Sequence, residues 1–428
     1  MSRTPEELRT LFWDEDRSLG CVVKEQYDEI KKVLSTKDFD WIKEQYKKIK
    51  AHAIRTTEYY KNYSIDDEFP VVDKTTINKN YEAHKAKFGF EPPIHISSTS
   101  GSTGTPFSVI QDYKKRKRTI ADLKVFGELC DYPSHERMVF FRVINDKLHR
   151  TPEQEEKENI YYIDSSNLSE GHLERMREKL LELNPRIVFS YSSTLVELAK
   201  YIADKKSDTK FSLHSVLVGG EGISEENRKL LQNVFGCKVY RRYSDMELGI
   251  LGQDNGDGKS YTLNWGSYYF ECLKIESDEE TESGEVGRIV ITDLFNKAMP
   301  MIRYDTGDLG VMERTSKNEL PFFKEIYGRK RDCIYKTNGE LLSPAKIFVL
   351  MWGSEGLYQW QFIQETKKDY VLKLNAKKDF DVCAVLDKLK SVIGLDARIE
   401  VELVNDIPVT ASNKRRAVIC NYKKEEDL

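Results

Sequence analysis

The 428-residue sequence lacks several features that would assign it to particular classes of protein. Its longest apolar run, residues 347–352, is far short of the ~20 apolar residues that a membrane span needs. The charged first sixteen residues hold no signal-peptide core. Seven cysteines are scattered and never form a Cys-x-x-Cys pair, which argues against a disulfide framework and a zinc ribbon. We therefore expect a cytoplasmic protein without a membrane span.

The charge balance also excludes some partners. Lys and Arg total 67 and Asp and Glu total 71, so the formal net charge is −4. This balance gives no reason to expect a nucleic acid or an anionic membrane as partner. One basic run, residues 114–118, is a candidate nucleic-acid patch, but no aromatic side chain is interleaved to stack on bases. We favour a solvated helix face for this run and expect no nucleic-acid partner.

The apolar pattern predicts the organisation of the chain. Residues 1–90 show helical spacing, and beyond them short apolar runs alternate with helical stretches, which is typical of an α/β fold with parallel sheets. Residues 261–291 alternate instead, which indicates a smaller β-rich subdomain. We expect residues 1–327 to form a large amino-terminal α/β body and residues 328–428 to form a small, mobile α+β carboxy-terminal domain.

A loop rich in hydroxyls and glycine is the most distinctive local segment. Residues 97–107 read Ser-Ser-Thr-Ser-Gly-Ser-Thr-Gly-Thr-Pro-Phe and follow a short strand-like run. Glycines let successive backbone amides face one anion, and the hydroxyls add further donors. The Gly-Lys-Ser/Thr ending of the common nucleotide-triphosphatase loop is missing. The segment is therefore either a phosphate-binding loop or a polar surface linker.

Four other segments carry groups that suit a nucleotide. Residues 241–247 place a tyrosine and a carboxylate at the end of an expected strand, where open sheets bind ligands. In residues 301–309, an aspartate after a glycine turn could accept hydrogen bonds from both ribose hydroxyls. Residues 328–332 lie at the expected domain boundary, and residues 407–416 frame one lysine in a loop. Alone, residues 241–247 are better explained as a solvated loop, and the aspartate of residues 301–309 has a turn aspartate as its simpler explanation.

Taken in order and at these spacings, the five segments resemble the adenylate-forming ligase superfamily. The similarity is closest to the phenylacetate–CoA ligase and CapK-like branch, through residues 69–74, the Arg303–Leu309 stretch and the Pro-x-Thr-x-Ser-x-Lys ending at residues 408–414. It covers residues 68–416. The resemblance implies ATP-dependent activation of a carboxylic acid as an acyl-adenylate, followed by transfer of the acyl group to CoA. A CapK-like amine acceptor on a sugar or small molecule, or a catalytically inactive nucleotide-binding module, are the alternatives.

The resemblance also implies a role for individual residues. The loop for the β- and γ-phosphates of ATP would comprise Thr99, Ser100, Gly101, Ser102, Thr103 and Gly104, with Thr103 as the principal catalytic hydroxyl. Groups around the adenine and ribose would be Gly220, Glu221, Tyr243, Ser244, Asp308 and Arg329, with Tyr243 stacking on the base. Glu247 would hold Mg²⁺, Lys414 would bridge the substrate carboxylate and the α-phosphate, and Arg331 would be the hinge.

Several positions depart from the superfamily pattern or leave its details open. Phe107 stands where many relatives have a lysine, and Asn413 replaces a glycine before Lys414. Residues 252–265 hold no cysteine or histidine, so we expect no zinc. By the resemblance, the acid would bind between residues 126 and 252, near Phe140, Phe141, Tyr191 and Ser192. The acid and the acceptor stay open, as does a homodimer.

Overall fold

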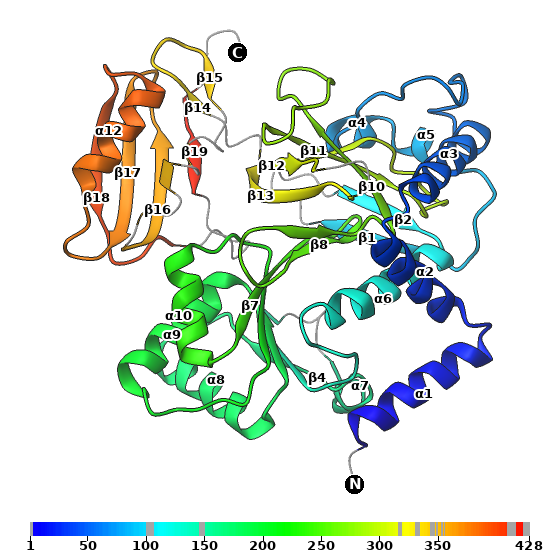
Figure 1. Cartoon of the computed structure of the whole chain (residues 1–428), viewed down its shortest axis with the longest axis horizontal. Helices are drawn as coiled ribbons and strands as arrows, with labels where there is room; N and C mark the ends of the chain where they lie inside the picture. Colours follow the sequence, from blue (N-terminus) through cyan, green and yellow to red (C-terminus); the bar gives the residue numbers. More distant parts are fainter. Residues whose placement is uncertain are drawn as a thin grey trace.

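The computed structural model describes residues 3–99, 107–144, 150–315, 319–329, 334–342, 347, 350–351, 354, 356–408 and 417–422. An eleven-stranded mixed sheet forms the centre of the larger body, in the order β10-β11-β12-β13-β9-β8-β7-β6-β5-β3-β4 (Figure 1). Its parallel half comprises β3 (Met138–Arg142), β4 (Ile160–Asp164), β5 (Ile187–Ser190), β6 (Ser215–Gly219) and β7 (Lys238–Asp245).

The other half of this sheet is antiparallel. It comprises β8 (Gly249–Asp254), β9 (Tyr261–Leu263), β10 (Tyr268–Leu273), β11 (Val286–Asp293), β12 (Tyr304–Glu313) and β13 (Phe322–Arg329). The strands that we expected in a separate β-rich subdomain therefore continue the main sheet. β7 pairs in parallel with β6 and antiparallel with β8, so the two halves meet at this strand.

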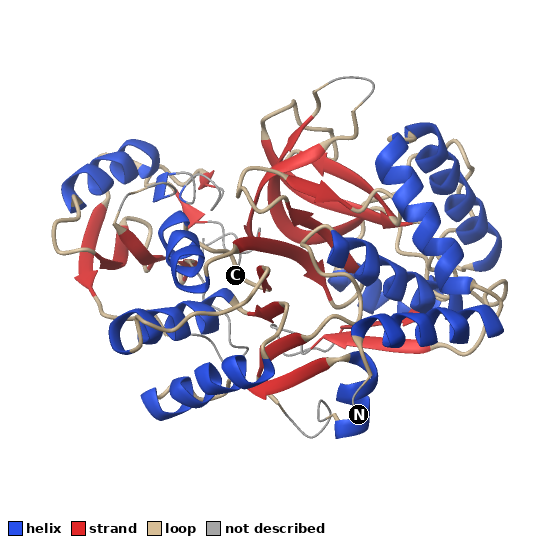
Figure 2. Cartoon of the chain, turned by 60° about the horizontal axis from the view of Figure 1, so that its bottom comes forward, coloured by secondary structure: helices blue, strands red, loops and turns tan. Residues whose placement is uncertain are grey.

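Helices cover both halves of the sheet. One face of the parallel half packs against α8 (Glu170–Leu183), α9 (Ser192–Lys205) and α10 (Glu225–Phe235) in a common apolar core. These strands read as continuous apolar runs because the inner strands of a parallel sheet are buried. A short helix, α7 (Pro152–Glu158), precedes β4. From another side, the helices lie along the outer flanks of the strands (Figure 2).

The amino-terminal region is helical, as predicted. Its helices are α1 (Pro5–Ser18), α2 (Val22–Thr36), α3 (Phe39–Thr56), α4 (Lys74–Lys79) and α5 (Tyr81–His84). Ile42 and Ile49, which recur at helical spacing, pack against the antiparallel half of the sheet. Side chains at Thr4 and Asp38 cap the first and third helices by accepting backbone N–H groups.

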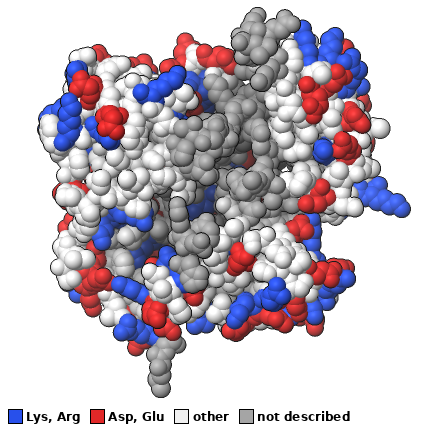
Figure 3. Space-filling view, turned by 180° about the vertical axis from the view of Figure 1, so that it is seen from behind, with Lys and Arg blue, Asp and Glu red and all other residues white. Residues whose placement is uncertain are grey.

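The basic run at residues 114–118 is not a fully solvated face. It lies on α6 (Tyr113–Glu128), and Lys115 and Arg118 are fully buried one turn apart. The Lys115 ammonium lies 2.7 Å from an Asp293 carboxylate oxygen, and Arg118 contacts the Glu29 carboxylate at 2.5 Å. Two of the five cations therefore anchor the helix to the body. Over the back of the molecule, Lys and Arg are interspersed with Asp and Glu around the rim (Figure 3).

The carboxy-terminal part has a separate sheet and its own apolar core. It contains β14 (Ile334–Tyr335), β15 (Leu341–Leu342), β16 (Leu357–Gln364), β17 (Asp369–Ala376), α12 (Val382–Ile393), β18 (Arg398–Leu403) and β19 (Val418–Cys420). Three pairings join four of these strands into one sheet, in the order β18-β17-β16-β19. The mixed α/β fold with a small carboxy-terminal domain is thus confirmed.

Within the described ranges, two hydrogen bonds join this small domain to the larger body. The Asn227 side-chain amide on α10 donates to the Tyr358 carbonyl at 2.9 Å, and the Gly356 amide donates to the Glu226 carboxylate at 3.2 Å. Both contacts lie where Figure 1 places β16 beside α10. None of the helices in the described ranges has the length and apolar character needed to cross a bilayer.

Candidate functional site

Tyr243 and Asp308, the residues predicted to bind adenine and ribose, lie in direct contact. The Tyr243 hydroxyl donates to the Asp308 carboxylate at 3.0 Å, although 65 residues separate the two. Burial and the Asp308 charge raise the pKa of Tyr243 well above its ordinary value, so the phenol stays a donor. Gly307 precedes Asp308 within β12 at φ +78°, a conformation that favours glycine, where the pairing with β11 is irregular.

Glu247, the predicted Mg²⁺ ligand, is buried beside a cation that sequence reasoning did not single out. Its carboxylate is 4% exposed, accepts a hydrogen bond from the Tyr304 hydroxyl at 2.8 Å and forms an ion pair with Lys74. Lys74 follows Val72, which bridges to Tyr304 in β12, so the lead-in segment runs directly beside the site. Lys74 belongs to residues 69–74, which carry part of the family resemblance, but the resemblance implied no functional role for this lysine.

A second carboxylate, Asp245, lies in the same electrostatic environment. Burial and the charge of Glu247 raise the pKa of Asp245 well above its usual range, while Lys74 acts in the opposite direction. The charge of Lys74 thus acts on both acidic side chains. Mg²⁺ prefers carboxylate oxygens and commonly binds through one or two of them together with nucleotide phosphates, so these residues fit the ion. Within the described ranges, no three His, Cys, Asp or Glu side chains surround one metal position.

The two strands that flank the predicted phosphate loop pair with each other beside the segment that carries Glu247. The flanking strands β1 (His95–Thr99) and β2 (Phe107–Gln111) pair antiparallel, with Thr99 opposite Phe107. The Ser97 hydroxyl donates to the Met246 carbonyl, and the Gln111 amide donates to the Glu247 carbonyl at 3.2 Å. The hairpin base therefore packs against the segment that carries Glu247. The loop residues Ser100, Gly101, Ser102, Thr103 and Gly104 and the Thr99 side chain lie outside the described parts of the chain.

The structure also locates other predicted residues. Gly220 is exposed at φ +73° directly after β6, and the Glu221 carboxylate accepts hydrogen bonds from the Ser192 hydroxyl at 3.1 Å and the Ser193 amide at 3.0 Å. Ser244 is exposed on β7. The Arg329 backbone pairs opposite Asp308. The Arg329 side chain, Arg331 and Lys414 lie outside the described residues.

Two of the residues expected around the acid are engaged elsewhere. Phe141, which we predicted near the acid, is fully buried in the core under α8 and α9. Side chains alternate along a strand, and Phe140 instead faces the opposite side. The Ser192 hydroxyl is occupied by Glu221 and by the Gly222 carbonyl, which lies 2.7 Å away. Tyr191 begins α9 as its N-cap residue.

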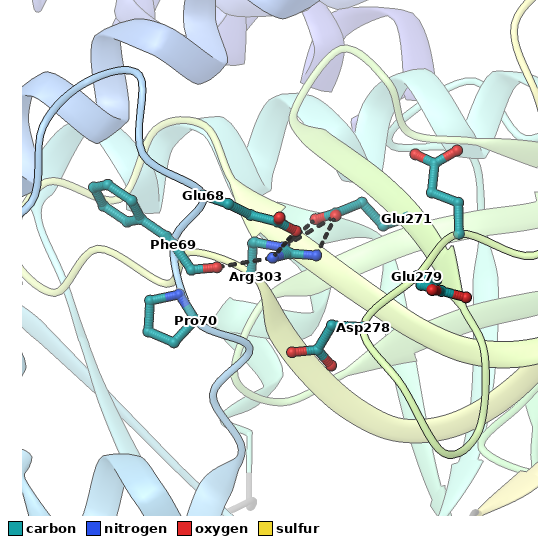
Figure 4. A pocket seen from close by; sticks show the side chains of 8 residues that line it. Glu68, Phe69, Pro70, Glu271, Asp278, Glu279 and Arg303 are labelled. Atoms are coloured by element: carbon teal, nitrogen blue, oxygen red, sulfur yellow. Dashed lines mark hydrogen bonds and ion pairs between the residues drawn. The ribbon is translucent and has the colours of Figure 1, made fainter.

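Arg303, from the matching Arg303–Leu309 stretch, has a positioning role. It lines a cavity of about 710 Å³, and Figure 4 shows its guanidinium between Glu68 and Glu271. The ion-pair distances are 2.6 Å to Glu68 and 3.0 Å to Glu271, and Arg303 also donates to the Phe69 carbonyl at 2.8 Å. These bonds fix the segment leading to Lys74 against β12.

Known proteins resemble the carboxy-terminal part of the chain and also its larger body. A family model described as the CapK C-terminal domain matches residues 334–421. Protein CapK of Staphylococcus aureus is 22% identical over 436 residues, covering 94% of this chain and 93% of that protein. The phenylacetate-coenzyme A ligase of Thermus thermophilus is 28% identical over 148 residues, or 33% of each chain.

Solved structures share the fold. A crystal structure of 2-hydroxyisobutyryl-CoA ligase in the postadenylation state has a TM-score of 0.68 at 16% identity and covers 90% of both chains. ATP-bound MatB from Rhodopseudomonas palustris has a TM-score of 0.52 at 15% identity, covering 74% of this chain and 65% of that one.

Proposed function

Because the chain belongs to the adenylate-forming ligase superfamily, we propose that it uses ATP to activate a carboxylic acid as an acyl-adenylate and then transfers the acyl group to CoA. The observation that carries this proposal is the contact between Tyr243 and Asp308 beside the buried Glu247. In this proposal, the Tyr243 ring would contact the base and the Asp308 carboxylate would bind the ribose. The Glu247 carboxylate would hold the metal ion at the phosphates.

The proposed chemistry needs alignment and charge neutralisation more than a protein nucleophile. A carboxylic acid substrate is already ionised near neutral pH, so no general base is required to begin its attack on the α-phosphate. The difficulty is the approach of two anions, which cations held in place can ease. In this proposal, Tyr243 stacks on adenine, Asp308 binds the ribose hydroxyls, and Thr103 binds phosphate. Mg²⁺ held at Glu247 would neutralise phosphate charge.

Lys414 has the central role in adenylation, as the cation between the substrate carboxylate and the α-phosphate. Exchange of pyrophosphate into ATP, dependent on a carboxylic acid, measures this first half-reaction alone. We expect Lys414→Ala to lose most exchange while thioester formation from a supplied acyl-adenylate falls much less. Lys388→Ala, which removes an exposed lysine from α12, is the matched control. Near-normal exchange in the Lys414 variant would contradict the assignment.

The carboxy-terminal domain, residues 328–428, would change its position between the two half-reactions about a hinge at Arg331. The support for this proposal is a small domain with its own core, joined to α10 by the contacts of Asn227 and Glu226. The second half-reaction would then present the acceptor to the acyl-adenylate.

A second candidate keeps the adenylation step and replaces CoA by an amine acceptor. The match of residues 334–421 to the CapK C-terminal domain favours it, because that match covers the domain that would approach the acceptor. Mass spectrometry of products formed with CoA, or with amino sugars and small amines in its place, separates the two. If no acid in an aryl, aliphatic and amino-acid panel supports pyrophosphate exchange, an inactive nucleotide-binding module becomes the better explanation.

A further inference from the structure

The ion pair between Lys74 and Glu247 lies where three segments of the larger body meet. Lys74 begins α4 after the lead-in segment, Glu247 follows β7, and Tyr304 begins β12. The Lys74 ammonium and the Tyr304 hydroxyl contact the same carboxylate oxygen of Glu247, Oε1, the hydroxyl at 2.8 Å. The Glu247 side chain is 4% exposed and that of Lys74 is 32% exposed. A half-buried cation therefore neutralises an almost fully buried anion.

The backbone that leads to Lys74 is fixed against β12. The Val72 amide donates to the Arg303 carbonyl at 3.0 Å, and the Asp305 amide donates to the Val72 carbonyl at 2.8 Å. Beyond its backbone, a lysine has a flexible four-carbon stem and a compact ammonium group. Among the described residues, Glu247 is the acidic group that pairs with this ammonium. If Glu247 received another cation, the ammonium could turn to a new anion while the backbone stayed in place.

Lys74 also lies where the predicted phosphate loop ends without a cation of its own. Phe107 stands at that end, in the place where many relatives have a lysine. The Lys74 ammonium lies 5.6 Å from the Phe107 ring centroid, and this ring is stacked on the Tyr304 ring at an interplanar angle of 6°. An aromatic face attracts a cation, so the position suits an ammonium group. The lead-in segment thus supplies, beside Phe107, a cation that position 107 lacks.

The position of this ammonium fits the phosphates of a nucleotide bound at the proposed site. Asp308, which we propose to bind the ribose, lies four residues after Tyr304 on β12. At about 3.3 Å per residue, these two positions are roughly 13 Å apart along the strand. A nucleotide with its ribose at Asp308 can extend its phosphates toward the Tyr304 end of β12, where Lys74 and Glu247 meet.

We propose that Lys74 is a phosphate-binding residue that exchanges partners. In the nucleotide-free protein its ammonium neutralises Glu247; when a nucleotide binds with Mg²⁺, Lys74 releases Glu247 to the metal ion and binds a phosphate oxygen instead. The inference rests on the proposed ligase function, which it deepens by adding a residue that binds the nucleotide phosphates. Glu247 keeps a cation in both states, so the exchange avoids the free-energy cost of a buried, unpaired carboxylate.

Nucleotide binding without Mg²⁺ isolates the role of Lys74. In EDTA the wild-type ammonium stays with Glu247, so ATP should bind little better than adenosine. Glu247→Gln removes the anion that holds Lys74, and its affinity for ATP in EDTA should rise about 10- to 100-fold, the effect of a hydrogen bond to a charged group. The double variant Lys74→Met, Glu247→Gln should lose this gain. Isothermal titration calorimetry measures each dissociation constant, with adenosine as the reference ligand.

The double variant excludes the simplest other explanation. If Glu247→Gln gained affinity only because one negative charge no longer repels the phosphates, the double variant would keep the gain, since it also lacks that charge. No gain in Glu247→Gln, or a gain that the double variant keeps, would overturn the inference.

A second comparison, with Mg²⁺ present, separates phosphate binding from a purely structural role. Lys74→Met should weaken the binding of ATP about 10-fold or more relative to adenosine, whereas a structural counter-ion of Glu247 would change both affinities by the same factor. The ratio of the two dissociation constants does not depend on the fraction of folded protein. Lys79→Met, which removes an exposed lysine at the other end of α4, is the matched control. An unchanged ratio in Lys74→Met, or equal wild-type affinities for ATP and adenosine, would contradict the inference.

These measurements need no acid and no acceptor, so they are independent of the ligase reaction. If the variants bind as expected but no acid supports pyrophosphate exchange, the inference holds and the proposed function fails alone. If exchange occurs while Lys74→Met leaves the ratio of ATP to adenosine affinity unchanged, the inference fails and the proposed function stands.

Discussion

The Tyr243 hydroxyl donates a hydrogen bond to the Asp308 carboxylate across a distance of 3.0 Å, although three strands separate β7 from β12 in the sheet. Neighbouring strands lie about 4.8 Å apart, so a flat sheet would place these two strands roughly 19 Å from each other. The sheet must therefore curl strongly between them. Strand β9 lies between β7 and β12 in the sheet order and is only three residues long. The ladder of paired residues is therefore shortest at β9.

This contact gives a direct test of the proposed nucleotide site. Tyr243→Phe keeps the ring and removes the donor to a charged group, so we expect the KM for ATP to rise about 10-fold. Asp308→Ala should raise it further, and the double variant should resemble Asp308→Ala because both changes break one hydrogen bond. Tyr201→Phe, which removes a hydroxyl bonded to Glu174 at 3.0 Å elsewhere, is the control. Additive effects in the double variant would argue against coupling.

The ion pair of Lys74 with Glu247 predicts how the protein responds to Mg²⁺. Lys74→Met leaves a buried carboxylate with the Tyr304 hydroxyl as its remaining close donor, so we expect a loss of about 1 to 3 kcal/mol in the free energy of unfolding. Added Mg²⁺ should raise the melting temperature of this variant more than that of the wild type, because the ion can replace the ammonium charge.

The double variant Lys74→Met, Glu247→Gln serves as the control for this prediction. It has no unpaired charge at position 247, so it should unfold at a higher temperature than Lys74→Met and lose the extra response to Mg²⁺. A double variant less stable than the single one would show that Lys74 acts by packing and not by its charge.

The contacts between α10 and β16 should influence the position of the carboxy-terminal domain. Asn227→Ala removes the donor to the Tyr358 carbonyl, which should shift the balance between domain positions by about 1 kcal/mol, or roughly 5-fold. Fluorescence energy transfer between labels on α8 and α12 measures that balance. Glu225→Ala, an exposed change on the same helix, should leave it unaltered. An unchanged transfer efficiency in Asn227→Ala would contradict the prediction.

Lys124 predicts a pH dependence of stability. Its ammonium lies 3.5 Å from the Phe12 ring centroid, and burial lowers the pKa of Lys124 from the ordinary 10.5 to about 7. The unfolded chain therefore binds more protons than the folded one between these values. Stability from this residue is fully present above about pH 10.5 and is lost as the pH falls to about 7, with a slope of at most about 1.4 kcal/mol per pH unit.

Chemical denaturation at a series of pH values checks this sign. Lys124→Met should remove the slope, whereas Lys117→Met on the same helix should keep it. A difference between wild type and Lys124→Met that does not change with pH would disprove the low pKa. This comparison cancels the titration of every group that the variants share.

Local patterns predicted much of the architecture. Apolar spacing is a property of neighbouring residues, so the amino-terminal helices and the buried parallel strands could be read directly from it. The order of the segments that we predict to bind a nucleotide was equally visible, because each combines glycine, hydroxyl or carboxylate groups within a few residues. The basic run was misread at Lys115 and Arg118, since their buried partners Asp293 and Glu29 are far away in the sequence.

By itself, then, the sequence determined the fold class and predicted which segments would bind a nucleotide. Only the tertiary structure decided that the expected β-rich subdomain continues the main sheet, that Lys74 reaches Glu247 and that Phe141 is buried in the core. The physical reason is the same in each case. Which face a strand buries and which charges meet depend on how distant strands pair and how strongly the sheet curls, and these are not properties of any one segment.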